Sequence, residues 1–357
     1  MLDRLNDDVL VLICAAAAAQ DTPLIALSET CRRLRIFCLP HIFRSISLRC
    51  ADSETWDNAR QKLLTWDPAS STYVRELSVL LPIEKRYGIS DTIPQDLPDK
   101  LLDMLETLSV ASKKHLEKLT IVIDEGQAPV FEAAFAARSP VFTHIRRLVV
   151  SPYNDYVAKY CPNVQVFSAT EIWYSRHDDY WNECDHSLRM IKQAAGLSDL
   201  KCFILGGQWN LHLMTALQES IPLINTLVIS TTLLGADFTF HDFVDHLSTL
   251  GVEVLSVPEV ADLNLGFSPA WHGAEYTGPN AMDFAMQVLN EQRDVEKYAA
   301  SVIFQRCESV QDLWFGIYAK ATRRKPKGEV LEVVWSHGEA TGCPPWLTSD
   351  EWLRPAT

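Results

Sequence analysis

The chain has 357 residues, of which 47% are hydrophobic and 10% aromatic, and its formal net charge is −14. This apolar content excludes an intrinsically disordered chain and predicts a large core, in one large domain or in two to three small ones. The negative charge argues against nucleic acid as a partner, because phosphates would repel such a surface.

No apolar run approaches the roughly 18 residues that a membrane-spanning helix requires, so we expect no membrane partner. The nine cysteines are an odd number and form no Cys-x-x-Cys pair. Several of them, such as Cys14 and Cys202, lie in apolar runs, where a thiol behaves as a small hydrophobic group. This usage is typical of a reducing compartment and predicts a cytoplasmic or nuclear protein.

The first segment of the chain, residues 5–48, predicts three short helices. Asn6 can cap the first helix, and the unbroken apolar run Val9–Ala19 predicts that this helix is buried on all sides. A domain near 40 residues seldom buries enough surface to fold alone, yet this segment has more apolar residues than one small core can hide. The excess predicts a second buried surface, against the rest of the chain or against a partner.

Two further helices complete this segment. Pro23 is expected to open the second helix at its first position, and Ser28 or Thr30 is expected to cap the third. Pro40 is expected to end the third helix. Residues 43–48 would then form a short apolar tail.

The segment resembles an F-box, in the form found at the N-terminus of many fungal F-box proteins. The resemblance rests on LNDDVLVLI and LIALSETCRRLRIFCLPHIFRSISL, although the family usually opens Leu-Pro and this chain has Leu5-Asn6. It implies docking onto a Skp-family adaptor, and through that adaptor onto a cullin–RING ubiquitin ligase. By position, the family's adaptor-contacting residues would fall on Leu5, Val9, Leu10, Ile13, Leu24, Leu27, Cys31 and Leu34.

Two other interpretations of the segment are open. A signal peptide would match the length of Val9–Ala19, but Asp3, Asp7 and Asp8 outweigh Arg4, so the region before it is not basic. An ordinary three-helix cap on a larger domain is the second alternative.

Residues 49–73 are predicted to form a connector with one helix, and from residue 74 onward strand-like runs alternate with helical patterns. The runs that predict strands are 74–81, 116–123, 145–151, 163–169, 200–206, 224–230, 252–258, 310–316 and 330–336. The helical patterns begin at Pro98 and Pro129, cover 188–195, 211–220 and 243–250, and end with a long one from Pro279 to about residue 307.

Seven of these runs share one spacing of apolar residues. They are Val74-Leu77-Val79, Leu116-Leu119-Ile121, Ile145-Leu148-Val150, Leu200-Phe203-Leu205, Ile224-Leu227-Ile229, Val252-Leu255-Val257 and Val310-Leu313-Phe315. This spacing resembles the strand half of a leucine-rich repeat, in which these residues turn inward and stack. The period wanders, and the usual asparagine after the strand is missing: Asp124, Tyr153, Thr232, Val260 and Tyr318 stand there.

The sequence therefore predicts an α/β protein with a three-helix F-box over 1–48, a helical connector over 49–73, and an irregular leucine-rich-repeat-like solenoid over 74–357. An α/β barrel or a doubly wound sheet is the alternative fold, because both also alternate strands and helices. Trp335, Trp346 and Trp352 are expected to close the open end of the solenoid.

The sequence contains few signals of a catalytic site. It contains no phosphate-binding loop, dinucleotide-binding glycine motif, nucleophile elbow or zinc-protease helix, so we expect no catalytic residue and no cofactor. The best catalytic candidates are carboxylates that follow strands, where a barrel would place paired acids: Asp124, Glu125, Glu171, Glu259 and Asp262. The alternative is that these carboxylates simply lie in solvated loops.

The densest polar and aromatic patch is the segment 173–186. Its His177, Cys184 and His186 match no zinc-site spacing, so we expect no metal there. The aromatic residues predicted to contact a target protein are Trp173, Tyr174, Tyr180 and Trp181. The one basic run, Arg323–Lys327, is interpreted as a solvated loop, with a nuclear import signal as the alternative.

Together these features predict a non-catalytic adaptor that holds an unknown target protein for a Skp–cullin–F-box ubiquitin ligase. The mechanism would be proximity, because holding the target raises its effective concentration near the ligase. A repeat scaffold without a ligase role and a barrel-type hydrolase are the alternatives.

Overall fold

A computed structural model describes residues 5–19, 24–49, 61, 72–81, 96–111, 116–169, 183–206, 209–229, 238–268, 280–324, 332–342 and 344–347. The protein is a mixed α/β protein that divides into two compact units, the first mainly up to Val164 and the second mainly from Gln165 onward. The predicted connector, 49–73, lies almost entirely outside the described residues, so its helix and the domain boundaries around it stay predictions.

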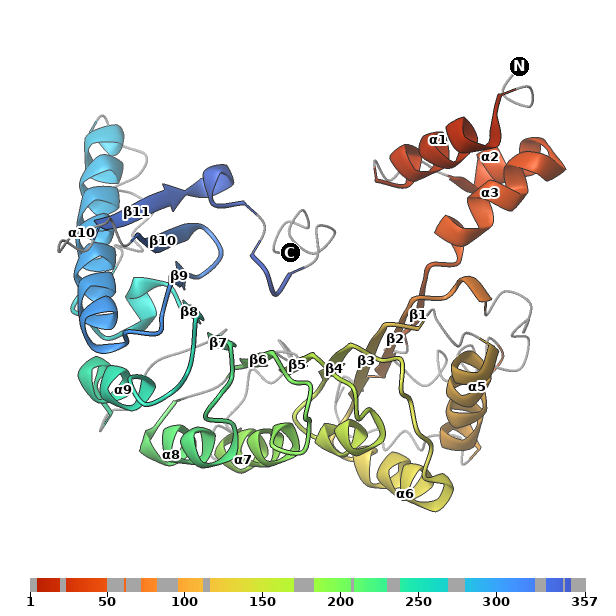
Figure 1. Cartoon of the computed structure of the whole chain (residues 1–357), viewed down its shortest axis with the longest axis horizontal. Helices are drawn as coiled ribbons and strands as arrows, with labels where there is room; N and C mark the ends of the chain where they lie inside the picture. The colour runs from red at the N-terminus through yellow and green to blue at the C-terminus, as the bar shows by residue number, and fades with distance from the viewer. Residues whose placement is uncertain are drawn as a thin grey trace. The chain divides into compact units, whose positions relative to one another are not determined.

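The first unit begins with three helices and continues with parallel strands. Its elements are α1 (Asp7–Ala19), α2 (Leu24–Thr30), α3 (Arg32–Ile42), β1 (Ser45–Arg49), β2 (Glu76–Leu81), α5 (Leu97–Ala111), β3 (Lys118–Ile123), α6 (Ala128–Arg138), β4 (Arg147–Val150) and the 3-10 helix η3 (Asp155–Tyr160). Strands β1 to β4 follow one another in chain order and run parallel where their pairing is defined. Figure 1 shows α5 and α6 on one side of these strands.

The second unit continues the same alternation. Its elements are β5 (Val166–Ala169), α7 (Glu183–Ala194), β6 (Cys202–Leu205), α8 (Leu211–Ser220), β7 (Thr226–Ile229), α9 (Phe240–Leu247), β8 (Val254–Val257), η5 (Val260–Asp262), α10 (Ala281–Arg306), β9 (Asp312–Phe315), β10 (Ala319–Arg324), β11 (Glu332–His337) and η6 (Gly338–Thr341). Strands β5 to β9 are parallel, whereas β9, β10 and β11 form an antiparallel meander. The turn from β9 to β10 starts at Gly316, whose φ of +56° favours glycine.

In the described part of the chain, the sheet has eleven strands in the order β1 to β11 and does not close, since β1 and β11 stand at opposite ends of that order. The alternative of an α/β barrel is therefore wrong. A doubly wound sheet is also wrong, because its strand order must reverse part-way and this order never does.

The core of each unit is built from one repeated position on each strand. Register partners on successive strands include Leu77, Leu119 and Leu148 in the first unit. In the second unit the equivalent chain of partners is Phe203, Leu227, Leu255 and Leu313. All of these side chains are fully buried. Among the residues of the seven predicted apolar triads, Leu200 alone is partly exposed, and the others are buried. The predicted inward register is therefore confirmed.

All nine predicted strands are present, but two further strands were missed. The expected tail after the third helix contains β1, where Leu48 is buried beside its partner Val79. The basic run contains the end of β10, so the predicted loop is wrong for Arg323 and Arg324. The rest of that run lies outside the described residues.

Arg323 is buried because it closes the end of a helix. Its guanidinium donates to the carbonyl oxygens of Glu308 at 2.9 Å and Cys307 at 3.0 Å, and also to that of Phe304. These oxygens lie at the C-terminal end of α10, where the helix dipole favours a positive charge. Burial lowers the pKa of the Arg323 guanidinium, because it disfavours the charged form.

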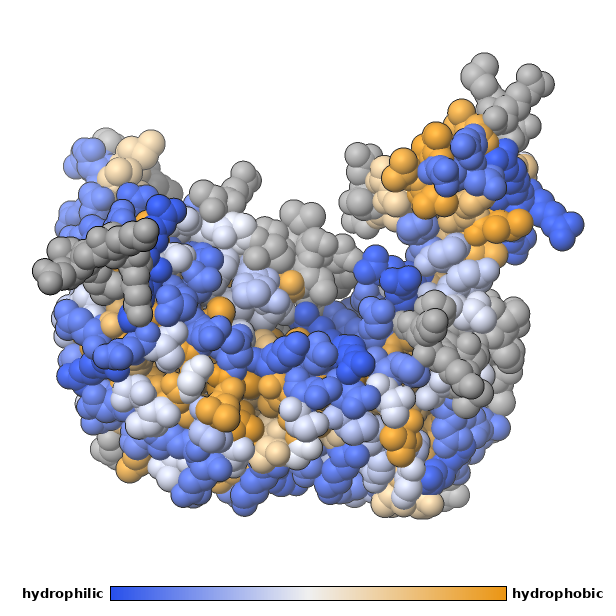
Figure 2. Space-filling model, in the orientation of Figure 1, coloured by the Kyte–Doolittle hydropathy of each residue, from blue (hydrophilic) through white to orange (hydrophobic). Residues whose placement is uncertain are grey.

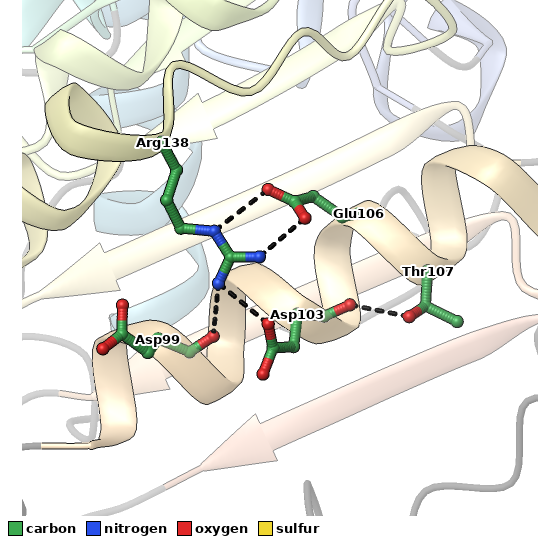
Figure 3. Close-up of polar contacts among 5 residues, drawn as sticks. All are labelled: Asp99, Asp103, Glu106, Thr107 and Arg138. Carbon is green, nitrogen blue, oxygen red and sulfur yellow. Dashed lines mark hydrogen bonds and ion pairs between the residues drawn. The ribbon is translucent and has the colours of Figure 1, made fainter.

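A second arginine joins two helices of the first unit, as Figure 3 shows. Arg138, the last residue of α6, donates to both carboxylate oxygens of Glu106 on α5, at 3.1 and 2.6 Å. It also reaches Asp103 at 2.8 Å and the carbonyl oxygen of Asp99 at 3.2 Å. The Glu106 and Asp103 bonds raise the pKa of Arg138, and the two-pronged geometry fixes how α6 lies on α5.

One asparagine after a strand bonds to the neighbouring strand, although the sequence has no asparagine at the expected position. Asn154 is buried after β4, and its side-chain oxygen accepts from the backbone N–H of Ile123 at 2.8 Å and from the Ser151 hydroxyl. It thus satisfies the end of the neighbouring strand β3. The expected position was Tyr153, so the asparagine is displaced by one residue rather than absent from this turn.

Candidate functional site

The candidate site is the surface of α1, α2 and α3. The first helix starts at Asn6, whose side chain accepts from the N–H of Asp8 at 3.4 Å and whose carbonyl oxygen accepts from Leu10. Asp7 and Asp8 lie in its first turn, where negative charge is stabilised by the helix dipole. The rest of α1 is rich in alanine, the residue with the highest helix propensity.

The third helix differs from its prediction at both ends. Its N-cap is Cys31, whose sulfur accepts from the N–H of Leu34 at 3.5 Å, so the predicted capping by Ser28 or Thr30 is wrong. Pro40 lies inside α3, which continues to Ile42. The lost donor at Pro40 leaves a carbonyl group near the end of a helix, where many carbonyls already lack a helical partner.

A small shared core and one arginine hold the three helices together. The buried side chains are Leu10, Cys14, Leu24, Leu34 and Cys38. Arg33 on α3 donates to the carbonyl oxygen of Leu5 at 2.6 Å and forms an ion pair with Asp7. This arginine therefore fixes the start of α1 against α3.

Two thiols face each other in this core. The sulfur atoms of Cys14 and Cys38 lie 3.7 Å apart. The pKa of the Cys38 thiol is raised from 9.0 to about 11, first by burial and then by the hydrogen bond and charge of Cys14. Both effects favour the neutral thiol, as expected for two cysteines that pack as hydrophobic groups.

This raised pKa predicts how stability depends on alkaline pH. Below pH 9 the Cys38 thiol is neutral in both the folded and the unfolded chain. Between pH 9 and about 11 the unfolded chain ionises first, so the folded state loses stability as pH rises. We expect the melting temperature to fall less steeply over this range in Cys38→Ala than in the parent, measured by circular dichroism. Equal slopes would contradict the prediction.

Several large apolar side chains of these helices remain exposed. Leu12 on α1 is 68% exposed, Ile25 on α2 is 60% and Ile36 on α3 is 56%, and Val9 and Val11 are also exposed. The prediction that the first helix is buried on all sides is therefore wrong for the chain by itself. Figure 2 shows apolar surface over these helices. The expected excess of apolar residues is present, and it lies at the surface.

The eight residues expected to contact an adaptor fall into three groups. Leu10, Leu24 and Leu34 are buried in the core of the helices. Val9 is exposed, and the others are partly exposed: Leu5, Ile13, Leu27 and Cys31. The most exposed positions, Leu12, Ile25 and Ile36, were absent from the prediction. An exposed apolar group of this kind is typical of an interaction site.

Two positively charged side chains lie near this apolar surface on α3. Arg32 and Arg35 on α3 are exposed, whereas Leu34, between them in the sequence, is buried in the core. Ile36 follows directly and is exposed. A partner that covers α3 should therefore offer an apolar surface with acidic groups at its margin.

The remaining predicted site residues are the target-binding aromatics and the carboxylates that follow strands. Trp173, Tyr174, Tyr180 and Trp181 lie outside the described residues, as do Glu171 and His177, whereas His186 lies on α7. Among the remaining carboxylates, Asp124 accepts from the N–H of Gly126 at 3.1 Å within a turn, and Glu125 and Glu259 are exposed. Within the described part of the chain, no group of three metal-ligating side chains comes together.

The chain was compared with known protein families and with curated proteins. No model of a known protein family matches the chain, and no curated protein matches it significantly. None of the helices that the structure describes is both long and apolar enough to pass through a membrane.

Proposed function

We propose that this chain is the target-recognition subunit of a Skp–cullin–F-box ubiquitin ligase. The observation that carries the proposal is the surface of α1–α3, where Leu12, Ile25 and Ile36 are exposed in a segment that resembles an F-box. Exposed leucine and isoleucine side chains on three successive short helices are costly in water and are stabilised when a partner covers them. The partner would be a Skp-family adaptor.

The strand–helix region supports the second half of the proposal. Its parallel strands follow chain order, and their buried residues stack in register, as expected for an irregular leucine-rich-repeat-like solenoid. The hydrogen bond that Asn154 accepts from the neighbouring strand also fits such repeats. Repeat proteins of this kind present extended surfaces for binding other proteins, so this region would hold the target.

In this proposal the chain performs no chemistry of its own. Helices α1–α3 hold the adaptor, and the remainder holds a target protein in the cytoplasm or nucleus. The ligase then acts on a target that cannot diffuse away, which raises its effective concentration. Neither a nucleic acid nor a membrane takes part.

The proposal predicts which substitutions weaken adaptor binding. Leu12→Asp places a charge on a side chain that is 68% exposed, so the fold should survive. At an apolar interface this charge should weaken binding about tenfold or more, or about 1.4 kcal/mol. The measurement is calorimetric titration of the full chain with a purified Skp-family adaptor. Ile25→Asp should act in the same way.

The matched control is Leu223→Asp, which makes the same change at a position 88% exposed in the second unit. It should leave the affinity for the adaptor unchanged. An equal loss of affinity in both variants would show that general charge, and not the surface of α1–α3, controls binding. Leu34→Asp is unsuitable, because Leu34 is buried and its replacement would unfold the three helices.

A further inference from the structure

The second unit has an apolar patch on the face of its sheet that the helices do not cover. Its buried members on the strands are Cys202 and Ile204 on β6, Val228 on β7 and Trp314 on β9. These residues alternate along their strands with Phe203, Leu227 and Leu313 of the core, so they point to the opposite face. We call these four residues the sheet-face patch.

The chain itself covers this patch. After β11 it turns back over the strands, on the side away from α7–α9 (Figure 1), and places Trp346 in the patch. Trp346 is only 4% exposed, and its ring meets Trp314 edge to face with centroids 5.3 Å apart. Leu347 packs beside it. The predicted role of the C-terminal tryptophans differs between them, since Trp335 instead stacks on Phe315 near the last strands.

The covering segment is a preformed turn. The N–H of Leu347 donates to the carbonyl oxygen of Pro344 at 3.0 Å, which places Pro345 and Trp346 at the two central positions. Proline favours the first of these positions because its φ is already fixed. The turn can therefore present Trp346 with little loss of conformational entropy, and the same chemistry would serve a turn from another protein.

Two features indicate that the turn can leave. Gly338, the first residue of the 3-10 helix η6, and Gly342, directly after that helix, have φ values of +59° and +70°, and a Cβ at either would meet nothing within 4 Å. The buried indole N–H of Trp314 has no acceptor among the described residues. A partner that offers a carbonyl oxygen there would satisfy this donor, which the closed arrangement does not.

We propose that the sheet-face patch is a docking site for a proline–aromatic turn of a partner protein, which the chain's own Pro344–Leu347 turn occupies until the partner displaces it. The inference rests on the proposed function in one respect: the partner would be the target protein. The tethered turn acts as a competitor at high effective concentration, so only a partner with further contacts would displace it.

The patch contains its own reporter, because Cys202 carries a buried thiol within it. In the full chain, Trp346→Ala should raise the rate of Cys202 alkylation by iodoacetamide about tenfold or more, since burial by a large aromatic group is lost. Cys307, buried on the helix side of the same unit, should stay slow and serve as the internal control. The readout is peptide mapping by mass spectrometry.

A peptide in trans tests the docking itself. The blocked peptide Pro-Pro-Trp-Leu, at about millimolar concentration, should slow Cys202 alkylation in Trp346→Ala, whereas Pro-Pro-Ala-Leu should not. Trp335→Ala, which makes the same change at the Phe315 stack, should leave Cys202 protected. An unchanged Cys202 rate in Trp346→Ala would overturn the covering role, and equal effects of the two peptides would overturn the docking site.

A second variant keeps the test decisive if Trp346→Ala unfolds the unit, which rapid alkylation of Cys307 would reveal. Trp346→Phe keeps an aromatic ring but loses contact area, so it should speed Cys202 alkylation less and still respond to the tryptophan peptide; a parent-like rate or no response would overturn the proposal. Adaptor binding by α1–α3 should be unchanged in both variants. Failure here is therefore distinguishable from failure of the proposed ligase role.

Discussion

Leu227→Ala is expected to lower the free energy of unfolding by about 3–5 kcal/mol. Leu227 is fully buried on β7, where its register partners are Phe203 on β6 and Leu255 on β8. Neighbours held on both sides by the sheet cannot collapse into the space that the side chain leaves, so the cost should include a cavity. Urea unfolding followed by circular dichroism measures the change.

The control for this prediction lies four residues away. Leu223→Ala makes the same substitution at a side chain that is 88% exposed, and it should change stability by less than about 0.5 kcal/mol. A small effect at both positions would mean that the stacked register residues do not form the core that supports the second unit.

Arg323→Met is expected to lower the free energy of unfolding by about 2–3 kcal/mol. The substitution keeps an unbranched side chain, but it removes the donors that serve the carbonyl oxygens of Phe304, Cys307 and Glu308. Part of the loss is offset, because burial of the guanidinium is itself unfavourable. The C-terminal end of α10 should show faster amide hydrogen exchange.

Arg324→Met is the matched control, since Arg324 is the next residue of β10 and is exposed. Its removal should leave both stability and hydrogen exchange near those of the parent. If Arg323→Met behaved like Arg324→Met, the carbonyl contacts would contribute nothing to the stability of α10.

The strands could be predicted from the sequence because their apolar spacing is short-ranged and repeated. Triads such as Leu116-Leu119-Ile121 each contain a full period of inward residues, and a buried strand requires no partner to be recognised. The same reasoning failed for β1 and β10. SISLR offers only Leu48 to the core, and the buried Arg323 resembles a solvated charge until α10 is seen beside it.

The candidate site could be predicted only in part. Val9–Ala19 is apolar at every position, so no periodic pattern indicates which side of α1 packs on its neighbours and which faces solvent. Tertiary packing makes that choice, placing Leu10 and Cys14 inside and Leu12 outside. Cys31 as a cap was missed for a different reason, since sulfur is a weak acceptor and seldom expected there.

The packing of Trp335, Trp346 and Trp352 could not be predicted from the sequence. The three were predicted to close the open end of a solenoid, but Trp335 stacks on Phe315, Trp346 packs on the sheet face, and Trp352 lies outside the described residues. Trp346 lies nine residues after the end of β11 at His337, a distance over which a chain can reach either face of a sheet. The face that Trp346 meets is the one that carries the sheet-face patch, where its ring contacts Trp314 on β9.

The central claim is that α1–α3 dock on a Skp-family adaptor. The most direct measurement is light scattering during size-exclusion chromatography of the full 40.3 kDa chain mixed with a purified Skp-family adaptor. The proposal predicts a single species with the summed mass of one chain and one adaptor, which separates into its components with Leu12→Asp. Separate elution of the unmodified chain and the adaptor would contradict it.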